Sequence, residues 1–341
     1  MELDAGDEVR LDVDVEAMGR VAAARRAQGE GRGEGDERDR RGSHGASVHR
    51  TGAAGPSCSA CSSSLSEAQS TGRGRLPRIG SIGSIRSSAS ARRGEEETMG
   101  HALVTGASRG MGLEWCRQLA RRGDRVVLTA RSAGKAEAAA ARLAEEGLEV
   151  LPRVLDVGDE ASMAALAGRL REELGHLDLV VNNAGINPKD AKAPGVFEST
   201  FQLAKLDPDE VLRCIRLNGV MPVVLVKHLL PLLEAAEQPL VLSISSWLGS
   251  IGAKTMGGHY GYATSKAALN MMNRAMALQL KEKGVAAVVV NPGWVQTDMG
   301  GAKAELTPER AIGGMIANVV EKVGLEETGE FFQWDGSRHP W

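Results

Sequence analysis

The chain has 341 residues and a formal net charge of -3, and 42% of its residues are hydrophobic. This length allows one large domain or two small ones, and the near-neutral charge gives no reason to expect nucleic acid or an anionic membrane as a partner. The sequence contains no unbroken run of eighteen apolar residues, so no transmembrane helix is predicted. Four cysteines in a chain of this length do not indicate a disulfide framework. We therefore expect a reducing, cytoplasmic compartment.

Residues 1–98 differ in composition from the rest of the chain. They contain no Lys, Phe, Trp or Tyr and are rich in Gly, Ser and Arg. Such a segment cannot bury enough apolar surface to offset its chain entropy, so we predict a disordered leader. Its single CxxC, Cys58 and Cys61, has no second pair nearby, so no metal site is expected. The simplest hypothesis is that translation starts at Met99, and organelle targeting by the leader is the alternative.

From residue 99 onward, short apolar runs alternate with segments of helical spacing. The predicted strands are 101–105, 125–130, 148–157, 177–185, 239–246 and 285–293. The predicted helices are 112–123, 134–147, 161–175, 211–236 and 262–284. Fully apolar strands that alternate with helices are typical of a parallel sheet covered on both faces. Residues 99–341 are therefore predicted to form one α/β domain of the Rossmann type, a doubly wound parallel sheet that binds ligands at the carboxyl ends of its strands.

The first turn has the sequence TGASRGMG at 105–112. It follows the first strand and opens the first helix, and its three glycines let the backbone approach a pyrophosphate at the helix N-terminus. A carboxylate that would bind an NAD ribose is expected at the end of the second strand. That position holds Ala130, followed by Arg131, and Arg109 lies in the glycine turn. Two guanidinium groups suit a 2′-phosphate, which favours NADP(H). The alternative is a pair of solvated arginines and an NAD(H) site.

Four motifs in this order resemble the short-chain dehydrogenase/reductase family: TGASRGMG, NNAG (182–185), YATSK (262–266) and NPGWVQTDM (291–299). The similarity covers 99–341. The ending TGEFFQWDGSRHPW is similar to C-factor and sniffer-type carbonyl reductases. The resemblance implies a carbonyl reductase that acts on a small-molecule carbonyl or alcohol, or a C-factor-like signalling protein that keeps the nucleotide site. It also implies a homodimer or homotetramer formed through the long helices.

The resemblance assigns roles residue by residue. The implied catalytic residues are Asn218, Ser246, Tyr262 and Lys266. The implied cofactor contacts are Gly106, Ser108, Arg109, Gly110, Met111, Gly112, Arg131, Asp156, Val157, Asn183, Ala184, Gly185, Tyr262, Lys266, Pro292, Gly293, Val295 and Thr297. The spacing of 16 residues between Ser246 and Tyr262 is longer than the common arrangement. We expect the extra residues to reshape the substrate mouth.

The chain contains only two tyrosines, Tyr260 and Tyr262. A tyrosine is a poor base at neutral pH unless a nearby cation lowers its pKa. Lys266 lies four residues after Tyr262 and thus on the same face of the predicted helix, whereas Thr264 has that place relative to Tyr260. Tyr262 is therefore the predicted proton donor to a substrate oxygen that Ser246 polarises. By resemblance alone, Asn218 is expected to hold a water that links Lys266 to solvent.

The side chains just past the strand ends leave one question open. Trp247, Met256, Trp294 and Met299 either line a substrate pocket or belong to the core. Composition and spacing favour neither.

Overall fold

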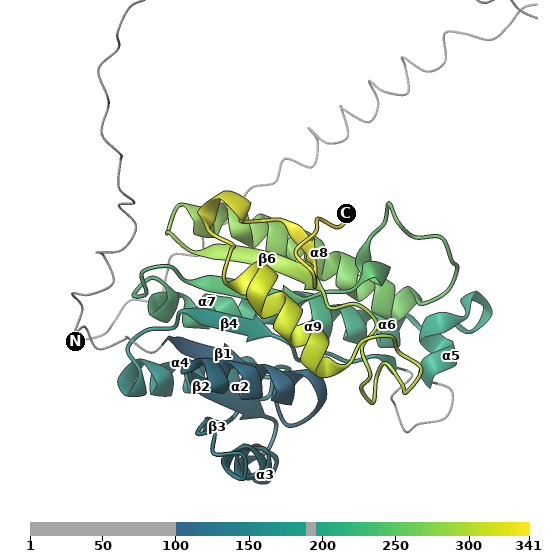
Figure 1. Ribbon diagram of the computed structural model, residues 1–341. Helices are drawn as coiled ribbons and strands as arrows, with labels where there is room; N and C mark the ends of the chain where they lie inside the picture. Colours follow the sequence, from purple (N-terminus) through teal and green to yellow (C-terminus); the bar gives the residue numbers. More distant parts are fainter. Residues whose placement is uncertain (1–99, 189–195) are drawn as a thin grey trace, which may run out of the picture. The chain divides into compact units, whose positions relative to one another are not determined.

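The computed structural model describes residues 100–188 and 196–341. The predicted leader, 1–98, lies outside the described residues. Within the described part the strands form one seven-stranded sheet in the order β3-β2-β1-β4-β5-β6-β7, and all neighbouring strands pair in parallel (Figure 1). The strands are β1 His101–Val104, β2 Arg125–Ala130, β3 Leu151–Val154, β4 Leu179–Asn182, β5 Leu240–Ile244, β6 Ala286–Asn291 and β7 Phe331–Gln333. This topology confirms the predicted Rossmann-type doubly wound sheet.

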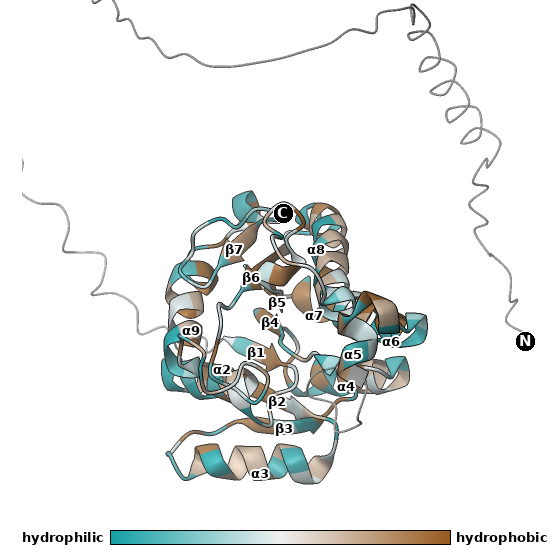
Figure 2. Ribbon diagram, turned by 90° about the vertical axis from the view of Figure 1, so that its right-hand side faces the viewer, coloured by the Kyte–Doolittle hydropathy of each residue, from teal (hydrophilic) through white to brown (hydrophobic). Residues whose placement is uncertain are grey.

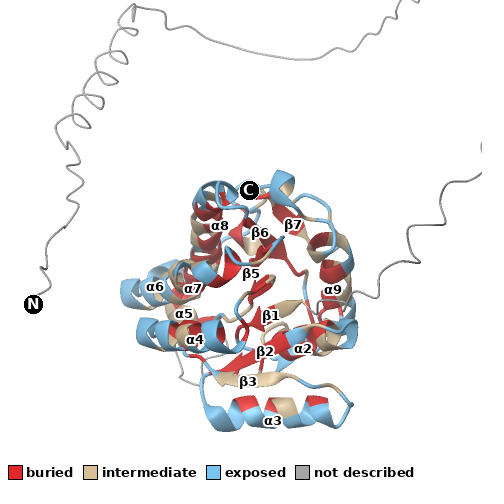
Figure 3. Ribbon diagram, turned by 90° about the vertical axis from the view of Figure 1, so that its left-hand side faces the viewer, coloured by how far each residue is buried: buried red, intermediate tan, exposed pale blue. Residues whose placement is uncertain are grey.

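Helices cover both faces of this sheet. They are α2 Gly110–Arg122, α3 Ala133–Ala144, α4 Glu160–Glu173, α5 Val196–Phe201, α6 Pro208–Ile215, α7 Met221–Leu233, α8 Tyr260–Lys281 and α9 Pro308–Met315. One buried apolar cluster joins α2, α3 and α9 to the sheet, and a second joins α4, α7 and α8 to its other face. Figure 2 shows hydrophobic strands between these helix layers, and Figure 3 shows them buried while the outer helix faces stay exposed.

Strands β1, β4, β5 and β6 are apolar along most of their length because both faces of the sheet are covered. Leu103, Val180 and Val288 are completely buried, for example. Because all neighbouring strands are parallel, their carboxyl ends come together at one edge of the sheet. The site residues predicted from the motifs follow these ends.

The long helix predicted over 211–236 is interrupted. Helix α6 passes into α7 through a π-helical turn, Arg216–Val220, that contains Asn218. By length and composition alone Pro208–Leu233 could cross a membrane, with a mean hydropathy of 1.3 over a window that is 44% buried. Polar residues such as Lys227 interrupt the apolar run of this segment, so the sequence pattern did not predict a transmembrane helix here. Core helices pass the same test, and here Leu225 and Leu229 are buried against the sheet.

The end of the chain was not predicted to contain regular structure. Helix α9 begins at Pro308, where Thr307 accepts a hydrogen bond from the backbone of Arg310 and caps the helix. Strand β7 adds only three residues to the edge of the sheet, and its Phe331 is buried. A strand this short carries no periodic signal that sequence patterns could detect.

Candidate active site at the carboxyl edge of the sheet

The glycine turn between β1 and α2 is fastened to the segment that follows β4. The Thr105 hydroxyl accepts hydrogen bonds from the backbone of Asn183 at 3.0 Å and Ala184 at 2.9 Å. The Asn183 side chain in turn donates to the Thr105 carbonyl at 2.9 Å. These contacts make the glycine turn and the NNAG segment one rigid unit. No role had been predicted for the buried Thr105, whose only signal was its place at the end of β1.

Two glycines in this turn have no room for a side chain or need a special backbone. A Cβ atom at Gly112 would lie 2.5 Å from the carbonyl oxygen of Gly106, and Gly106 itself has φ +66. Arg109 occupies the N-cap position of α2, and no side chain caps the helix there. The first backbone N–H groups of α2 can therefore bind an anion, and the helix dipole favours one at this end.

The residues that would select the cofactor lie beside this turn. Ala130 is buried at the end of β2, and Arg131 directly after it is exposed. The Arg109 guanidinium pairs with the Asp298 carboxylate, and both side chains are 74% exposed. An exposed pair of this kind contributes little stability, so Arg109 can exchange Asp298 for a phosphate at small cost.

Other predicted cofactor residues line the same edge. Asp156 follows β3 and accepts a hydrogen bond from the Gly158 backbone at 2.8 Å, while Val157 packs against the core. Thr297 lies against the glycine turn, since a Cβ atom at Gly110 would be 3.6 Å from its methyl group. The remaining predicted contacts are Ser108 and Met111 at the start of α2, and Pro292, Gly293 and Val295 directly after β6.

Ser246 follows β5 and caps a short 3-10 turn, Trp247–Gly249. Its Oγ accepts a hydrogen bond from the Leu248 backbone at 3.2 Å, so its proton remains available for donation. The Trp247 backbone donates to the side chain of Asn291 at 3.1 Å, which ties this turn to the end of β6. Ser246 is therefore a buried hydroxyl at a fixed position.

Lys266 is buried on α8, one helical turn after Tyr262. Its Nζ donates to the carbonyl of Ile244 at 2.7 Å and lies 5.7 Å from the centre of the Tyr262 ring. Burial lowers the pKa of Lys266 to about 8. The Ser246 turn packs directly on this residue, since a Cβ atom at Gly249 would lie 2.9 Å from the Lys266 backbone. The structure thus brings Ser246, Tyr262 and Lys266 to one place.

The side chain of Asn218 is fully occupied by protein contacts. Its Oδ1 accepts from the Ile186 backbone at 2.8 Å, and its Nδ2 donates to the Ile186 carbonyl at 2.8 Å and to Ser265 Oγ at 2.9 Å. These bonds tie the segment after β4 to α8, and they position Gly185 close to Lys266. A water held by Asn218 would therefore have to use the backbone carbonyl in the π-helical turn.

A family model described as short chain dehydrogenase matches residues 100–307. The chain belongs to this family. C-signal of Myxococcus xanthus is 35% identical over 167 residues, which cover 49% of this chain and 94% of that protein. Among solved structures, the NADPH-bound carbonyl reductase from chicken fatty liver aligns with a TM-score of 0.64 and 29% identity, over 71% of this chain and 99% of that one. Carbonyl reductase Sniffer of D. melanogaster aligns with a TM-score of 0.63 and 29% identity, over 71% and 100%.

The C-terminal segment of this short-chain dehydrogenase contacts the turn that follows its candidate catalytic serine. The carbonyl of Trp341 accepts hydrogen bonds from Ser250 Oγ at 2.8 Å and from the Gly252 backbone at 3.1 Å. The Trp341 ring lies 5.4 Å from the buried ring of Phe331 in β7. Sequence patterns gave no signal for this contact, because it joins positions 91 residues apart.

The apolar side chains past the strand ends are not core residues. Met256 and Trp294 are each 48% exposed, and Trp247 and Met299 are half-buried. Ile251, in the extended loop between Ser246 and Tyr262, is 80% exposed. This exposure shows that Met256 and Trp294 do not belong to the core.

Proposed function

We propose that this short-chain dehydrogenase is an NADP(H)-dependent carbonyl reductase that interconverts a carbonyl and an alcohol. The observation that carries the proposal is the grouping of Ser246, Tyr262 and buried Lys266 beside an uncapped helix N-terminus at a glycine turn. The chicken carbonyl reductase, with which the chain shares its fold, is bound to NADPH. Reduction is the expected direction in a cell.

Each candidate catalytic group has a distinct task. Ser246 Oγ donates a hydrogen bond to the substrate carbonyl oxygen and polarises it. When bound, NADPH would supply the hydride for the carbonyl carbon. Tyr262 gives its phenolic proton to the oxygen, and the Lys266 ammonium lowers the pKa of the tyrosine and stabilises the phenolate that remains. Asn218 acts through the position of α8, to which its side chain is bonded.

Selection of NADP(H) over NAD(H) rests on Arg131, Arg109 and the absence of a carboxylate at Ala130. We expect Arg131→Ala to weaken NADPH binding by about ten- to a hundredfold, the value of a charge-assisted contact, and to leave NADH binding nearly unchanged. Arg125→Ala is a matched control, because this exposed arginine begins the same strand at the opposite edge. Fluorescence titration of both nucleotides measures the effect, and equal losses for NADPH and NADH would refute the 2′-phosphate assignment.

The direct test of the activity is NADPH consumption by the full chain with a panel of aldehydes and ketones at fixed pH. The similarity to C-signal supports a second candidate, a signalling protein that keeps the nucleotide site. The two candidates give different results. A carbonyl reductase turns over at least part of the panel, whereas a pure signalling protein binds NADPH without consuming it.

Exposed apolar side chains support a homodimer or homotetramer built through the long helices. Leu212 on α6 is 59% exposed, and Met271 and Leu278 on α8 are 71% and 58% exposed. Isolated apolar residues are common on surfaces, but these lie on helices that pack together. Light scattering on the wild type and on Met271→Lys with Leu278→Lys tests this expectation. A lower mass for the variant supports it, and an unchanged mass contradicts it.

A further inference from the structure

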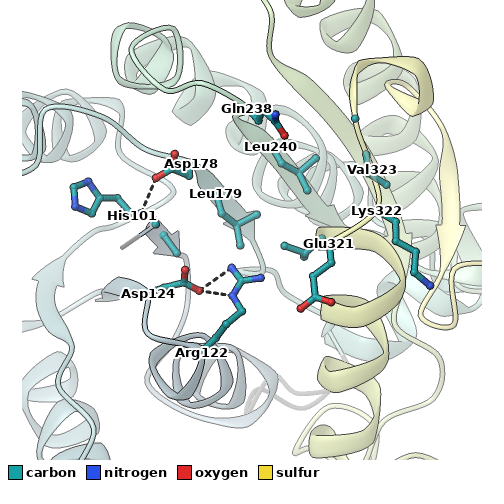
Figure 4. A pocket seen from close by; sticks show the side chains of 14 residues that line it. His101, Arg122, Asp124, Asp178, Leu179, Gln238, Leu240, Glu321, Lys322 and Val323 are labelled. Carbon is teal, nitrogen blue, oxygen red and sulfur yellow. Dashed lines mark hydrogen bonds and ion pairs between the residues drawn. The ribbon is translucent and has the colours of Figure 1, made fainter. Parts of the chain in front are cut away.

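Two histidines and an aspartate meet at the amino edge of the sheet, opposite the candidate active site. His101 begins β1, Asp178 directly precedes β4, and His176 lies in the connection before it. The His101 backbone N–H donates to Asp178 Oδ2 at 2.7 Å, and the Asp178 N–H donates to the His101 carbonyl at 2.9 Å. Figure 4 shows the first of these bonds beside the Arg122–Asp124 ion pair. Two of the three residues are therefore fixed by the start of the parallel ladder.

The distances among these side chains suit a metal ion. Their candidate ligand atoms all lie within 4.8 Å of one another. His176 Nε2 and Asp178 Oδ2 are 3.3 Å apart. In a tetrahedral site with bonds of about 2.0–2.1 Å, two ligand atoms are separated by about 3.4 Å. The His176–Asp178 pair already has that separation.

One contact with a backbone carbonyl orients the His101 ring. Its Nδ1 lies 3.2 Å from the carbonyl of His176, to which it can donate a proton. The lone pair is then on Nε2, an arrangement typical of histidines that bind a metal. The two imidazole rings contact each other, with their centroids 4.3 Å apart and their planes tilted by 30°.

The surroundings of the triad carry charges of both signs and are open to solvent, and the nearby Asp124 carboxylate is paired with Arg122 at 2.7 Å. A Cβ atom at Gly100 would lie 2.8 Å from the Asp124 carboxylate and 3.9 Å from that of Asp178. A cavity of about 310 Å³ adjoins the site and is lined in part by His101 and Asp178.

We propose that His101, His176 and Asp178 form a binding site for a divalent transition metal such as Zn²⁺. Two imidazoles and a carboxylate match the preference of Zn²⁺, Co²⁺ and Ni²⁺ for nitrogen and oxygen ligands. Three protein ligands leave a coordination position open to water. The site joins β1 to the start of β4, and it stands independently of the proposed reductase activity because it lies at the opposite edge of the sheet.

The test is a titration of the full chain with Zn²⁺ by calorimetry and with Co²⁺ by visible absorption. The protein carries Cys58→Ser and Cys61→Ser, because thiolates outside the described residues would bind the same ions. We expect one ion per chain and a Co²⁺ spectrum of nitrogen and oxygen ligands, without thiolate charge-transfer bands. His176→Gln and Asp178→Asn should each weaken binding at least about tenfold, the loss that removal of even an outer-shell partner can cause.

A matched control is His228→Gln, since His228 also contacts a carboxylate, that of Glu160 at 2.9 Å, but has no second histidine beside it among the described residues. Its Zn²⁺ affinity should equal that of the parent. Zn²⁺ should also raise the melting temperature of the parent and of His228→Gln more than that of His176→Gln. The proposal would be overturned if the parent did not bind one Zn²⁺ per chain. It would also be overturned if His176→Gln and Asp178→Asn bound Zn²⁺ as tightly as the control, which would leave an ordinary histidine–aspartate pair.

Discussion

The two edges of the sheet use polar and charged residues for different purposes. At the carboxyl edge, buried polar side chains such as Thr105, Asn218 and Lys266 bind backbone groups and join segments that follow different strands. At the amino edge, ion pairs such as Arg122–Asp124 lie at helix ends and at the starts of strands. The first arrangement fixes the geometry of the candidate active site, and the second pairs charges where strands and helices begin and end.

The glycines show this difference most clearly. Gly112 at the carboxyl edge has the Gly106 backbone where its side chain would be. Gly284, which follows α8 at the amino edge, has φ +75, and a Cβ atom there would have no neighbour within 4 Å, so this glycine only ends a helix. One glycine allows two backbone segments to approach, and the other allows a left-handed turn.

Tyr262→Phe is expected to have the largest effect. It removes the phenolic proton and little else, so turnover with NADPH should fall about a hundred- to ten-thousandfold while NADPH binding is retained. Tyr260→Phe is the matched control, because Tyr260 lacks a lysine four residues later, and it should keep its maximal rate within about a few-fold. Steady-state turnover measures both. An inactive Tyr260→Phe with an active Tyr262→Phe would show that the chemistry belongs to the other tyrosine.

Gly112→Ala and Gly284→Ala compare the two edges directly. The first must displace the glycine turn, and we expect NADPH affinity to fall about ten- to a hundredfold. The second places alanine in the left-handed region and should cost about 1–2 kcal/mol of unfolding free energy without changing NADPH affinity. Nucleotide titration and urea denaturation distinguish them. Similar NADPH losses in both variants would remove the contrast between the edges.

Lys266 should make folding stability depend on pH. Burial lowers its pKa from 10.5 to about 8, so between these values the unfolded chain binds a proton that the folded chain does not. For this group the free energy of unfolding therefore rises with pH across that window.

Lys266→Met removes the cost of burying the ammonium. It should be about 1–3 kcal/mol more stable than the wild type at pH 7, less so at pH 10, and inactive. Urea denaturation at both pH values measures this, and a Lys266→Met protein less stable at pH 7 would contradict it.

Ser250→Ala should have the smallest effect on the reaction. It removes the hydrogen bond from the Ser246 turn to the Trp341 carbonyl, and we expect kcat/KM to fall about two- to tenfold. NADPH affinity should stay unchanged. Ser337→Ala is the control, because Ser337 lies on the same C-terminal segment but donates to Asp335. A Ser250→Ala protein that keeps full kcat/KM would show that the C-terminal contact does not position the turn.

The sequence predicted the sheet well and the details of its edges less well. Apolar runs and glycine turns are local signals, so β1 to β6 could be located from them. Ser246 was assigned by resemblance to the family, and Tyr262 and Lys266 by that resemblance and by their spacing of four residues. Three other features depend on contacts between positions far apart in the chain, which local patterns do not reveal. They are the hydrogen bonds of Thr105, the π-helical turn at Asn218 and the contact of Trp341 with Ser250. The His101–His176 pair has the same cause, since parallel pairing joins positions 75 residues apart.

The central claim is that hydride reaches a carbonyl at the carboxyl edge while Tyr262 supplies the proton. The most direct measurement uses NADPH carrying two deuterium atoms at C4 of the nicotinamide, the full chain and 4-nitrobenzaldehyde or the best carbonyl of the panel. Mass spectrometry of the alcohol should show one carbon-bound deuterium per molecule with the wild type and almost no product with Tyr262→Phe. An alcohol without deuterium, or equal product from Tyr262→Phe, would contradict the account.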